Sequence, residues 1–174
     1  VNSSVKLVDA HAFFTCDPSE KNRELLRNQI AGVKYYAAVP ADYGEPHAKP
    51  YHRDPPEANV TFLRRLKGDG PWSHRPGFSD ERDAIHTGNS AYGAANLAYH
   101  IGPRRIAFFG MDGGGGYADG LEGTHGDLSH LSQIFGTAFR FFDKKRIQVL
   151  NASPNSIVNC FRRCSIEDGI KWIS

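Results

Sequence analysis

The alternation of helix and strand in the second half of the chain is the feature that most constrains its fold. A continuous apolar strand is expected over residues 104–110, and a further strand is expected over residues 146–150. The spacing of apolar residues predicts helices over residues 89–100, 127–142 and 165–173. A continuous apolar strand is typical of a position covered on both faces. Because strands and helices that alternate through short links form right-handed crossovers, the sequence predicts a three-layer, Rossmann-like α/β domain with a mainly parallel sheet.

The N-terminal part of the chain predicts a strand, a helix and a second strand. Residues 5–15 are expected to form a turn and a strand, and residues 33–39 form a strand rich in valine and tyrosine. Between them, Asp17 is suited to the N-cap of a helix, Pro18 to its first position and Glu20 to a capping box. A helix cap is a sufficient explanation of Asp17, although a carboxylate beside a helix start is also a well-placed hydrogen-bond acceptor.

Residues 40–82 differ in composition from the rest of the chain. They contain seven of the ten prolines and many charged residues, and only residues 59–66 have a regular pattern, which fits a short strand or helix. A long irregular stretch is usually a functional loop or lid. The length of 174 residues is that of one ordinary domain. We therefore predict a single domain over residues 1–174, with an irregular, proline-rich insertion or lid at about residues 40–82.

Composition and charge exclude several classes of protein. The chain is 40% hydrophobic and 23% charged with a formal net charge of +2, which argues against disorder and does not indicate a nucleic-acid-binding protein. No apolar run approaches the roughly 20 residues of a membrane span, so no membrane partner is expected. The three cysteines, Cys16, Cys160 and Cys164, have no CxxC spacing and fit a reducing compartment. We expect a cytoplasmic protein.

Polar and glycine-rich segments follow three of the predicted strands. They are residues 15–17, 110–116 and 151–156. Ligands of open parallel sheets bind beyond the carboxyl ends of the strands, so we expect these segments to open on the same edge. Asp112 and the glycines from Gly113 onward can form a plain turn and loop, although glycines also let backbone N–H groups approach a phosphate. In the last segment, Pro154 can shape the chain, which leaves Asn155 or Ser156 to contact a ligand.

The start of the helix predicted over residues 89–100 is a further candidate site. Thr87, Gly88 and Asn89 lie there, where free N–H groups and the helix dipole attract anions. A simple helix cap by Thr87, Asn89 or Ser90 explains the same residues equally well. This segment matches neither a Walker A loop nor a GxGxxG motif.

His125 and His130 form, with Asp127, the densest cluster of titratable residues. A histidine with a pKa of about 6.5 suits general acid or base catalysis near neutral pH. A solvated loop histidine is the alternative for each. Two histidines five residues apart are a poor fit to two ligands on one helix face, so no metal site is predicted here.

The block at residues 85–112, IHTGNSAYGAANLAYHIGPRRIAFFGMD, resembles the central block of a superfamily of Rossmann-like transferases. The superfamily includes the bacterial CMP-sialic acid sialyltransferases, the motility accessory factor flagellin glycosyltransferases and the MptE-like 6-hydroxymethylpterin diphosphokinases. The nearest pattern is similar to that of an uncharacterised group common in bacteriophage genomes, whose further motifs correspond to residues 124–127 and to residues 151–156 with Phe161. The resemblance covers about residues 1–20 and 84–170.

The resemblance implies a set of residues that contact a nucleotide-activated donor. They are Asn2, Asp17, Thr87, Gly88, Asn89, Asp112, Gly113, Tyr117, Asn155 and Ser156. The family's general base is a histidine ahead of the helix before the last strand, and this role falls to His125 or His130. The phage-group pattern favours His125, whereas the position relative to the helix favours His130.

The chain departs from the family pattern at its start. The family's first strand and its Gly-x-Gly-Pro-Ser loop, which recognises much of the nucleotide diphosphate, would come just before Val1. The expected domain therefore lacks its first strand and its glycine-rich loop. Either the sequence is a fragment or this member has lost part of its donor site.

The resemblance implies a glycosyltransferase that moves a sugar from a nucleotide-activated donor to an acceptor hydroxyl without a required metal. The acceptor could be a glycan, a protein or a modified DNA base, and a phage-encoded protein would act in the host cytoplasm. One alternative is an MptE-like diphosphotransferase dependent on ATP and Mg²⁺, for which Asp112, Asp119 and Asp127 could hold the metal. The other alternative is a non-catalytic binding or structural module of a phage.

Overall fold

The chain divides into two compact units, unit 1 (Val1–His100) and unit 2 (Ile101–Ser174). The computed structural model describes residues 9–17, 19–40, 59–112 and 128–174. The fold is α/β, with parallel strands flanked by helices, as the sequence predicted for a Rossmann-like protein. Within these described ranges, no helix is both long enough and apolar enough to cross a membrane.

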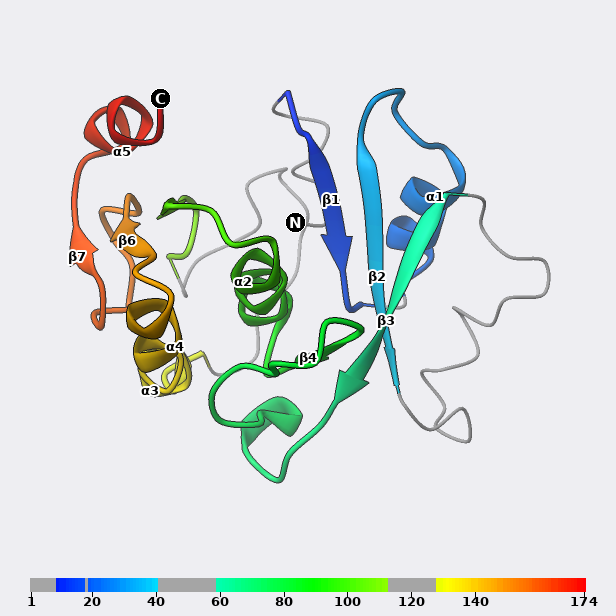
Figure 1. Cartoon of the computed structure of the whole chain (residues 1–174), viewed down its shortest axis with the longest axis horizontal. Helices are drawn as coiled ribbons and strands as arrows, with labels where there is room; N and C mark the ends of the chain where they lie inside the picture. Colours follow the sequence, from blue (N-terminus) through cyan, green and yellow to red (C-terminus); the bar gives the residue numbers. More distant parts are fainter. Residues whose placement is uncertain (1–8, 18, 41–58, 113–127) are drawn as a thin grey trace. The chain divides into compact units, whose positions relative to one another are not determined.

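Unit 1 is built on a four-stranded parallel sheet with the strand order β1-β2-β3-β4. Its strands are β1 (Ala12–Thr15), β2 (Lys34–Pro40), β3 (Val60–Leu66) and β4 (Ala84–His86). The register pairs Phe13 with Tyr35 and Tyr36 with Thr61, and Figure 1 shows β1, β2 and β3 side by side. Because every pair is parallel, the carboxyl ends of all four strands lie at one edge of the sheet.

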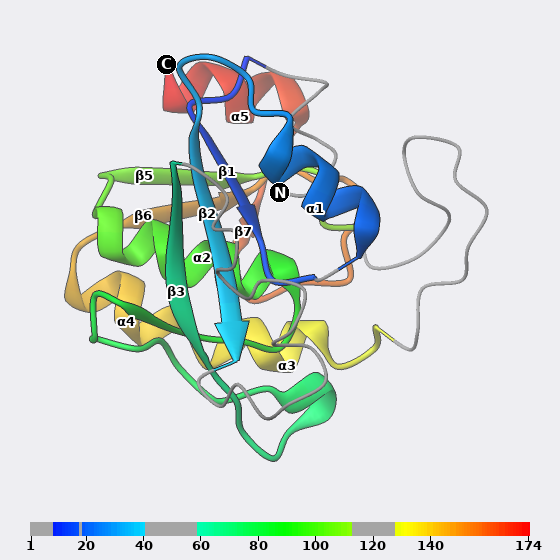
Figure 2. The same cartoon turned by 90° about the vertical axis from the view of Figure 1, so that its right-hand side faces the viewer.

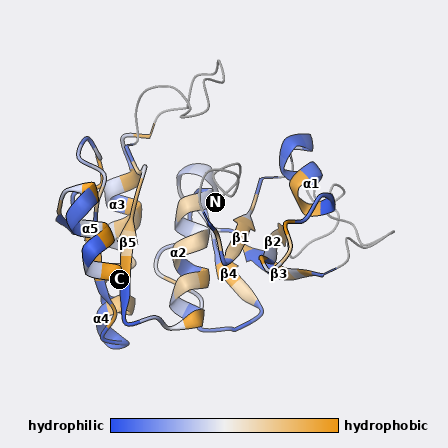
Figure 3. Ribbon diagram, turned by 90° about the horizontal axis from the view of Figure 1, so that it is seen from above, coloured by the Kyte–Doolittle hydropathy of each residue, from blue (hydrophilic) through white to orange (hydrophobic). Residues whose placement is uncertain are grey.

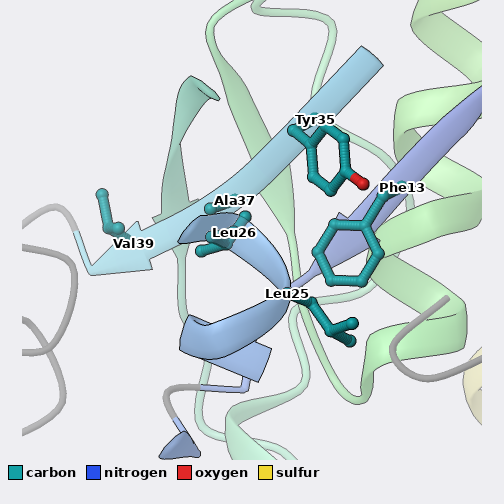
Figure 4. Close-up of a cluster of buried hydrophobic side chains, with 6 residues drawn as sticks. All are labelled: Phe13, Leu25, Leu26, Tyr35, Ala37 and Val39. Carbon is teal, nitrogen blue, oxygen red and sulfur yellow. The ribbon is translucent and has the colours of Figure 1, made fainter. Parts of the chain in front are cut away.

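The helix α1 (Glu20–Arg27) covers one face of this sheet. Phe13 and Tyr35 point to this face, where they form a buried cluster with Leu25 and Leu26 (Figure 4). The ring centroids of Phe13 and Tyr35 lie 5.3 Å apart. Since burial of one such side chain contributes about 1.5–3 kcal/mol to stability, this cluster is what attaches α1 to the sheet.

The helix α2 (Ser90–Ile101) covers the opposite face. Phe14 and Ile85 point to this face and pack in one cluster with Leu97. Gly93 allows the helix to come close, because a Cβ atom there would lie 3.0 Å from the Phe14 ring. In Figure 3, α2 is pale orange over most of its length, whereas α1 carries blue as well as orange residues. With one helix on each face, unit 1 is the predicted three-layer arrangement.

The start of α1 differs from the prediction. The N-cap is Ser19 rather than Asp17. Asp17 Oδ1 accepts a hydrogen bond from the Ser19 N–H at 3.0 Å, in the turn just ahead of the helix. Asp17 Oδ2 accepts another from Asn22 Nδ2, also at 3.0 Å. Glu20 is the first helical residue instead of a capping-box partner, and it forms an ion pair with Arg23 at 3.1 Å. Asp17 therefore stabilises the turn ahead of the helix.

The prediction of an irregular segment over residues 40–82 was too broad. β3 lies inside the sheet and pairs with β2 from Val60 to Arg65, so the regular pattern over residues 59–66 is a strand and not a helix. A short 3₁₀ helix, η3 (Pro71–Ser73), follows in the connection to β4. The prolines did not exclude a strand because those after residue 58 lie in this connection and not in β3. Residues 41–58, to which a lid interpretation can still apply, lie outside the described residues.

Unit 2 contains a three-stranded parallel sheet with the order β5-β6-β7. Its elements are β5 (Arg105–Phe108), β6 (Gln148–Asn151), β7 (Arg162–Arg163), α3 (Leu131–Gly136), α4 (Phe139–Lys144) and α5 (Ile166–Ile173). Figure 2 shows β5 and β6 side by side. The Phe108 ring lies 5.6 Å from the Phe135 ring and 5.5 Å from the Phe161 ring, measured between centroids. These aromatic contacts attach α3 to the sheet.

The single helix predicted over residues 127–142 is two helices, α3 and α4. At the break, the Thr137 and Ala138 N–H groups bond to the carbonyls of Ile134 and Phe135, three residues back. The Thr137 hydroxyl also donates to the Ile134 carbonyl at 2.7 Å. A side chain that bonds to the preceding turn competes with the α-helical ladder, which explains the break.

β5 is less buried than its apolar sequence predicted. Arg105 is exposed, and the residues from Ile106 to Phe108 are half-buried. The reason is that β5 lies at the end of the β5-β6-β7 order, so it has one strand neighbour within this sheet. α5 packs closely beside the end of β5. A Cβ atom at Gly169 of α5 would lie 3.3 Å from the ring of Phe109, the residue that follows β5.

Candidate functional site

The carboxyl edge of the unit 1 sheet brings together two of the predicted site segments. Cys16, which follows β1, and Ser90, the first residue of α2, have Sγ and Oγ 3.3 Å apart. Arg65 near the end of β3 donates from Nη1 to the Cys16 carbonyl at 2.9 Å. Segment 15–17 and segment 87–90 are therefore direct neighbours, as expected for strand ends of a parallel sheet.

The side chains at the end of β1 mainly stabilise the local conformation of the chain. The Thr15 hydroxyl accepts from the Asp17 N–H at 3.1 Å, and burial raises the pKa of the Cys16 thiol, so this group stays neutral near pH 7. The Asp17 carboxylate is exposed and bonds to Ser19 and Asn22. Of these three residues, Asp17 is the one whose side chain faces solvent.

The residues from Thr87 to Asn89 form the junction between β4 and α2. Asn89 Oδ1 accepts from the Tyr92 N–H at 2.7 Å, so Asn89 caps the helix, as one of the two interpretations proposed. Thr87 is buried, and its carbonyl accepts from the Arg75 N–H at 3.0 Å. Gly88 is buried too. The junction is thus a closely packed turn that directs the first N–H groups of α2 toward the carboxyl edge.

A buried polar network behind this junction was missed by the sequence analysis. Asn96 of α2 is fully buried, and its Oδ1 accepts from the N–H groups of Ser79 at 3.0 Å and His86 at 2.8 Å. The Tyr92 hydroxyl donates to the Gly77 carbonyl at 2.6 Å. The signal that could have revealed it is an asparagine within a helix of small and apolar residues, because a buried amide must find partners.

His86 belongs to the same network. Its Nδ1 lies 3.0 Å from the Gly77 carbonyl, and since a carbonyl only accepts, Nδ1 carries the proton in this contact. Burial lowers the pKa of His86 below its usual value, so the ring is neutral near pH 7. The network therefore ties the end of β4 to the connection that precedes it.

Nearby, Tyr99 of α2 donates from its hydroxyl to Asp80 Oδ1 at 2.5 Å. Burial together with this carboxylate raises the pKa of Tyr99 to about 12. This hydroxyl is therefore a hydrogen-bond donor over the whole physiological pH range. It holds the connection ahead of β4 against the second half of α2.

The other two predicted segments meet within unit 2. The Asp112 carbonyl accepts from the Ile157 N–H at 3.2 Å, and the Ser156 hydroxyl donates to the Met111 carbonyl at 2.5 Å. Ser156 also accepts from the Val158 N–H at 3.1 Å and is buried, so its hydroxyl has a structural role. The side chain of Asp112 is exposed.

Two further polar residues of this edge stabilise the local backbone, and neither was predicted to contact a ligand. The Ser153 hydroxyl accepts from the Met111 N–H at 2.8 Å. The buried Asn151 donates from Nδ2 to the Val158 carbonyl at 2.9 Å and accepts from the Ser153 N–H at 3.1 Å. This network leaves Asn155 exposed at the edge, together with Asp112.

Of the two catalytic candidates, His130 is described by the structure. It occupies the N-cap position of α3, is half-buried, and its carbonyl accepts from the Ile134 N–H at 3.0 Å. The predicted residues outside the described ranges are Asn2, Pro18, Gly113, Tyr117, Asp119, His125 and Asp127. Within the described part of the chain, no three His, Cys, Asp or Glu side chains gather as a metal site.

The predicted donor-contact residues that the structure describes thus fall into two groups. Asp17, Thr87, Gly88 and Asn89 lie at the carboxyl edge of unit 1, and Asp112, Asn155 and Ser156 lie at that of unit 2. Comparison with family models, with curated proteins and with solved structures finds no match for this chain. The superfamily resemblance therefore enters below as a proposal.

Proposed function

We propose that this protein binds a nucleotide-activated sugar and transfers the sugar to an acceptor hydroxyl. The observation that carries the proposal is that the end of β1 and the start of α2 meet at the carboxyl edge of a parallel sheet, where Cys16 Sγ and Ser90 Oγ lie 3.3 Å apart. In open parallel sheets this edge is where ligands bind. The superfamily resemblance supports the same assignment, because its implied donor contacts include residues 87–89.

The negatively charged part of the donor is its phosphate group. The first N–H groups of α2 and the helix dipole favour an anion at this place. α2 has twelve residues, and its N-cap, Asn89, is uncharged and so does not repel phosphate. The superfamily resemblance also implies donor contacts for Asp112 and Asn155, which are exposed in unit 2.

The transfer step needs a base and a stabilised leaving group. In the proposed reaction, His125 or His130 removes the proton from the acceptor hydroxyl, and the oxygen attacks the anomeric carbon of the sugar. The bond between this carbon and the phosphate oxygen breaks, and its electron pair stays on the phosphate. Positive electrostatic potential at the start of α2 would stabilise that charge as it develops. No metal is required for this chemistry.

A ligand panel tests this proposal. Unfolding of the full chain is followed by thermal shift with CMP, UDP, GDP, ATP and their sugar conjugates, each with Mg²⁺ and with EDTA. A ligand at about 100 times its Kd adds about 2.7 kcal/mol to stability, which raises Tm by several degrees. We expect a shift with a pyrimidine nucleotide that EDTA does not abolish.

Two other outcomes would contradict the proposal. A shift with ATP that requires Mg²⁺ favours the diphosphotransferase alternative. No shift with any nucleotide favours a non-catalytic binding module. A sugar-transfer assay with His125→Ala and His130→Ala separates the two base candidates, because loss of a general base reduces turnover about 10²–10⁴-fold.

A further inference from the structure

Arg65 lies near the carboxyl end of β3, and its side chain is on the face of the sheet that α2 covers. Residues two apart in a strand point to the same face, and Leu63 packs in the buried cluster beneath α2. Arg65 is also the register partner of Ile85 in β4, and Ile85 belongs to the same cluster. The arginine is therefore at the carboxyl edge, on the side where α2 begins.

The guanidinium group of Arg65 reaches past β2 to the end of β1. Its Nη1 donates to the Cys16 carbonyl at 2.9 Å, and the thiol of the same cysteine is 3.3 Å from the hydroxyl of Ser90, the first residue of α2. Burial raises the pKa of the Cys16 thiol, whereas the hydrogen bond to Ser90 and the positive charge of Arg65 act to lower it. One residue, Cys16, thus contacts both the arginine and the start of α2.

The positive charge of Arg65 is not balanced by a carboxylate in the described part of the chain. The preceding residue, Arg64, points to the opposite face and forms ion pairs with Asp83, at 2.9 Å, and with Glu81. Arg65 forms no ion pair with a described Asp or Glu side chain. The two adjacent arginines therefore differ: the charge of Arg64 is paired, and that of Arg65 is available to an anion.

Part of the guanidinium group remains accessible to a ligand. An arginine has five N–H donors, and the Cys16 carbonyl accepts from one of them. Nε is buried without a hydrogen-bond partner, which is a cost to the fold, whereas Nη2 is not buried and Arg65 as a whole is half-buried. The exposed Asp17 carboxylate bonds to Ser19 and Asn22 rather than to Arg65. A structural role thus accounts for one hydrogen bond and leaves the Nη2 donors unexplained.

We infer that Arg65 binds the donor phosphate through its Nη2 donors, beside the first N–H groups of α2. The inference rests on the proposed function. The guanidinium charge and the helix dipole then act on the same anion from two independent sources. An arginine stays charged over the whole physiological pH range, so it donates hydrogen bonds to phosphate oxygens and transfers no proton. When the bond to the sugar breaks, its electron pair goes to the phosphate, and the added negative charge strengthens this contact.

Substitutions of the two adjacent arginines separate a phosphate contact from a general effect of charge. Arg65→Gln removes the charge but keeps a side-chain N–H, Arg65→Lys keeps the charge, and Arg64→Gln is the matched control that removes one charge from the opposite face. The Kd of inorganic pyrophosphate is measured by isothermal titration calorimetry in EDTA. We expect it to rise about tenfold or more in Arg65→Gln, less in Arg65→Lys, and to stay within about twofold in Arg64→Gln. An equal Kd in the two glutamine variants, or a larger loss in Arg65→Lys than in Arg65→Gln, would overturn the inference.

A second measurement needs no variant of the site. The arginine Nε–H signals of the wild-type chain are assigned through the backbone resonances of each residue and followed by NMR during a titration with inorganic pyrophosphate. Because Nε and Nη2 belong to one delocalised group, a hydrogen bond from Nη2 changes the Nε–H signal as well. We expect pyrophosphate to shift the signal of Arg65 and not that of Arg64. An unshifted Arg65 signal would overturn the inference.

The measurements also keep the inference apart from the proposed function. If a nucleotide sugar binds equally well to the wild type and to Arg65→Gln, the function stands and the inference fails. If pyrophosphate shifts the Arg65 signal while no nucleotide binds, Arg65 is a phosphate contact and the assigned donor class fails. If neither ligand has an effect, both fail.

Discussion

At the scale of single residues, the buried polar side chains of unit 1 explain how the end of β4 is positioned. Asn96 accepts from two backbone N–H groups, and His86 donates to the Gly77 carbonyl that Tyr92 also reaches. Leaving a buried donor or acceptor without a partner costs about 1–3 kcal/mol, so each member of this network is difficult to replace. The position of Thr87 and Gly88 therefore depends on this buried network.

The network makes a prediction about pH. Because burial lowers the pKa of His86 in the folded protein, the unfolded chain takes up this proton first as the pH falls through about 6.5. The folded state is therefore destabilised below that pH, and the stability due to neutral His86 is recovered at higher pH. In His86→Asn, which keeps an N–H donor near Nδ1, the free energy of unfolding should fall less between pH 7.5 and 5.5 than in the wild type.

Urea unfolding at several pH values measures this difference. The carboxyl groups of Glu20 and Asp83, whose pKa values are lowered by Arg27 and Arg64, titrate below this window and do not affect the comparison. Equal pH slopes for wild type and His86→Asn would show that His86 does not titrate differently in the folded and unfolded states.

At the scale of elements, the distance between α2 and the sheet depends on one glycine. A Cβ atom at Gly93 would lie 3.0 and 3.1 Å from two atoms of the Phe14 ring and 3.3 Å from Ile85 Cδ1. Gly136 of α3 has nothing within 4 Å of the same added atom. Gly93 lies within α2 and Gly136 is the last residue of α3. The two positions differ most in the space that an added Cβ atom would have.

We expect opposite effects of alanine at these two glycines. Gly93→Ala should lower the free energy of unfolding by about 1–3 kcal/mol, because overpacking outweighs the gain in helix propensity. Gly136→Ala should raise it by about 0.4–1 kcal/mol. Urea unfolding of both variants measures the pair, and a stabilised Gly93→Ala would mean that α2 does not approach the sheet as closely as described.

Some helices and strands could be predicted from the sequence and others could not. The helix predicted over residues 165–173 is α5, which begins after its N-cap Ser165. The Ser165 Oγ accepts from the Asp168 N–H at 3.0 Å, a contact between residues close in the sequence, and such a start can be predicted from a local pattern. The split between α3 and α4 was not predicted, since Thr137 interrupts the helix without interrupting its apolar spacing. β4 and β7, with three and two residues, are too short to show any alternation.

At the scale of the whole molecule, the α/β class and the parallel strands could be predicted because they follow from the order of elements along the chain. The division into the units Val1–His100 and Ile101–Ser174 could not, because it depends on contacts between distant segments. The same holds for the candidate site. Its strand-end segments were predicted from topology, whereas Asn96 and Ser153 support them through contacts that no local pattern reveals.

The central claim is that a donor phosphate binds at the start of α2, and a charge placed at the N-cap tests it most directly. Asp caps a helix as well as Asn does, so Asn89→Asp should fold normally while its carboxylate repels a phosphate. Ser165→Asp makes the same kind of change at the N-cap of a different helix, α5.

The measurement is the Kd, by isothermal titration calorimetry in EDTA, of the nucleotide that gives the largest thermal shift. We predict that Asn89→Asp weakens binding about tenfold or more, as repulsion between like charges a few ångströms apart requires, and that Ser165→Asp leaves the Kd unchanged. Equal affinity of wild type and Asn89→Asp, or a wild-type chain that binds no nucleotide, would contradict the account.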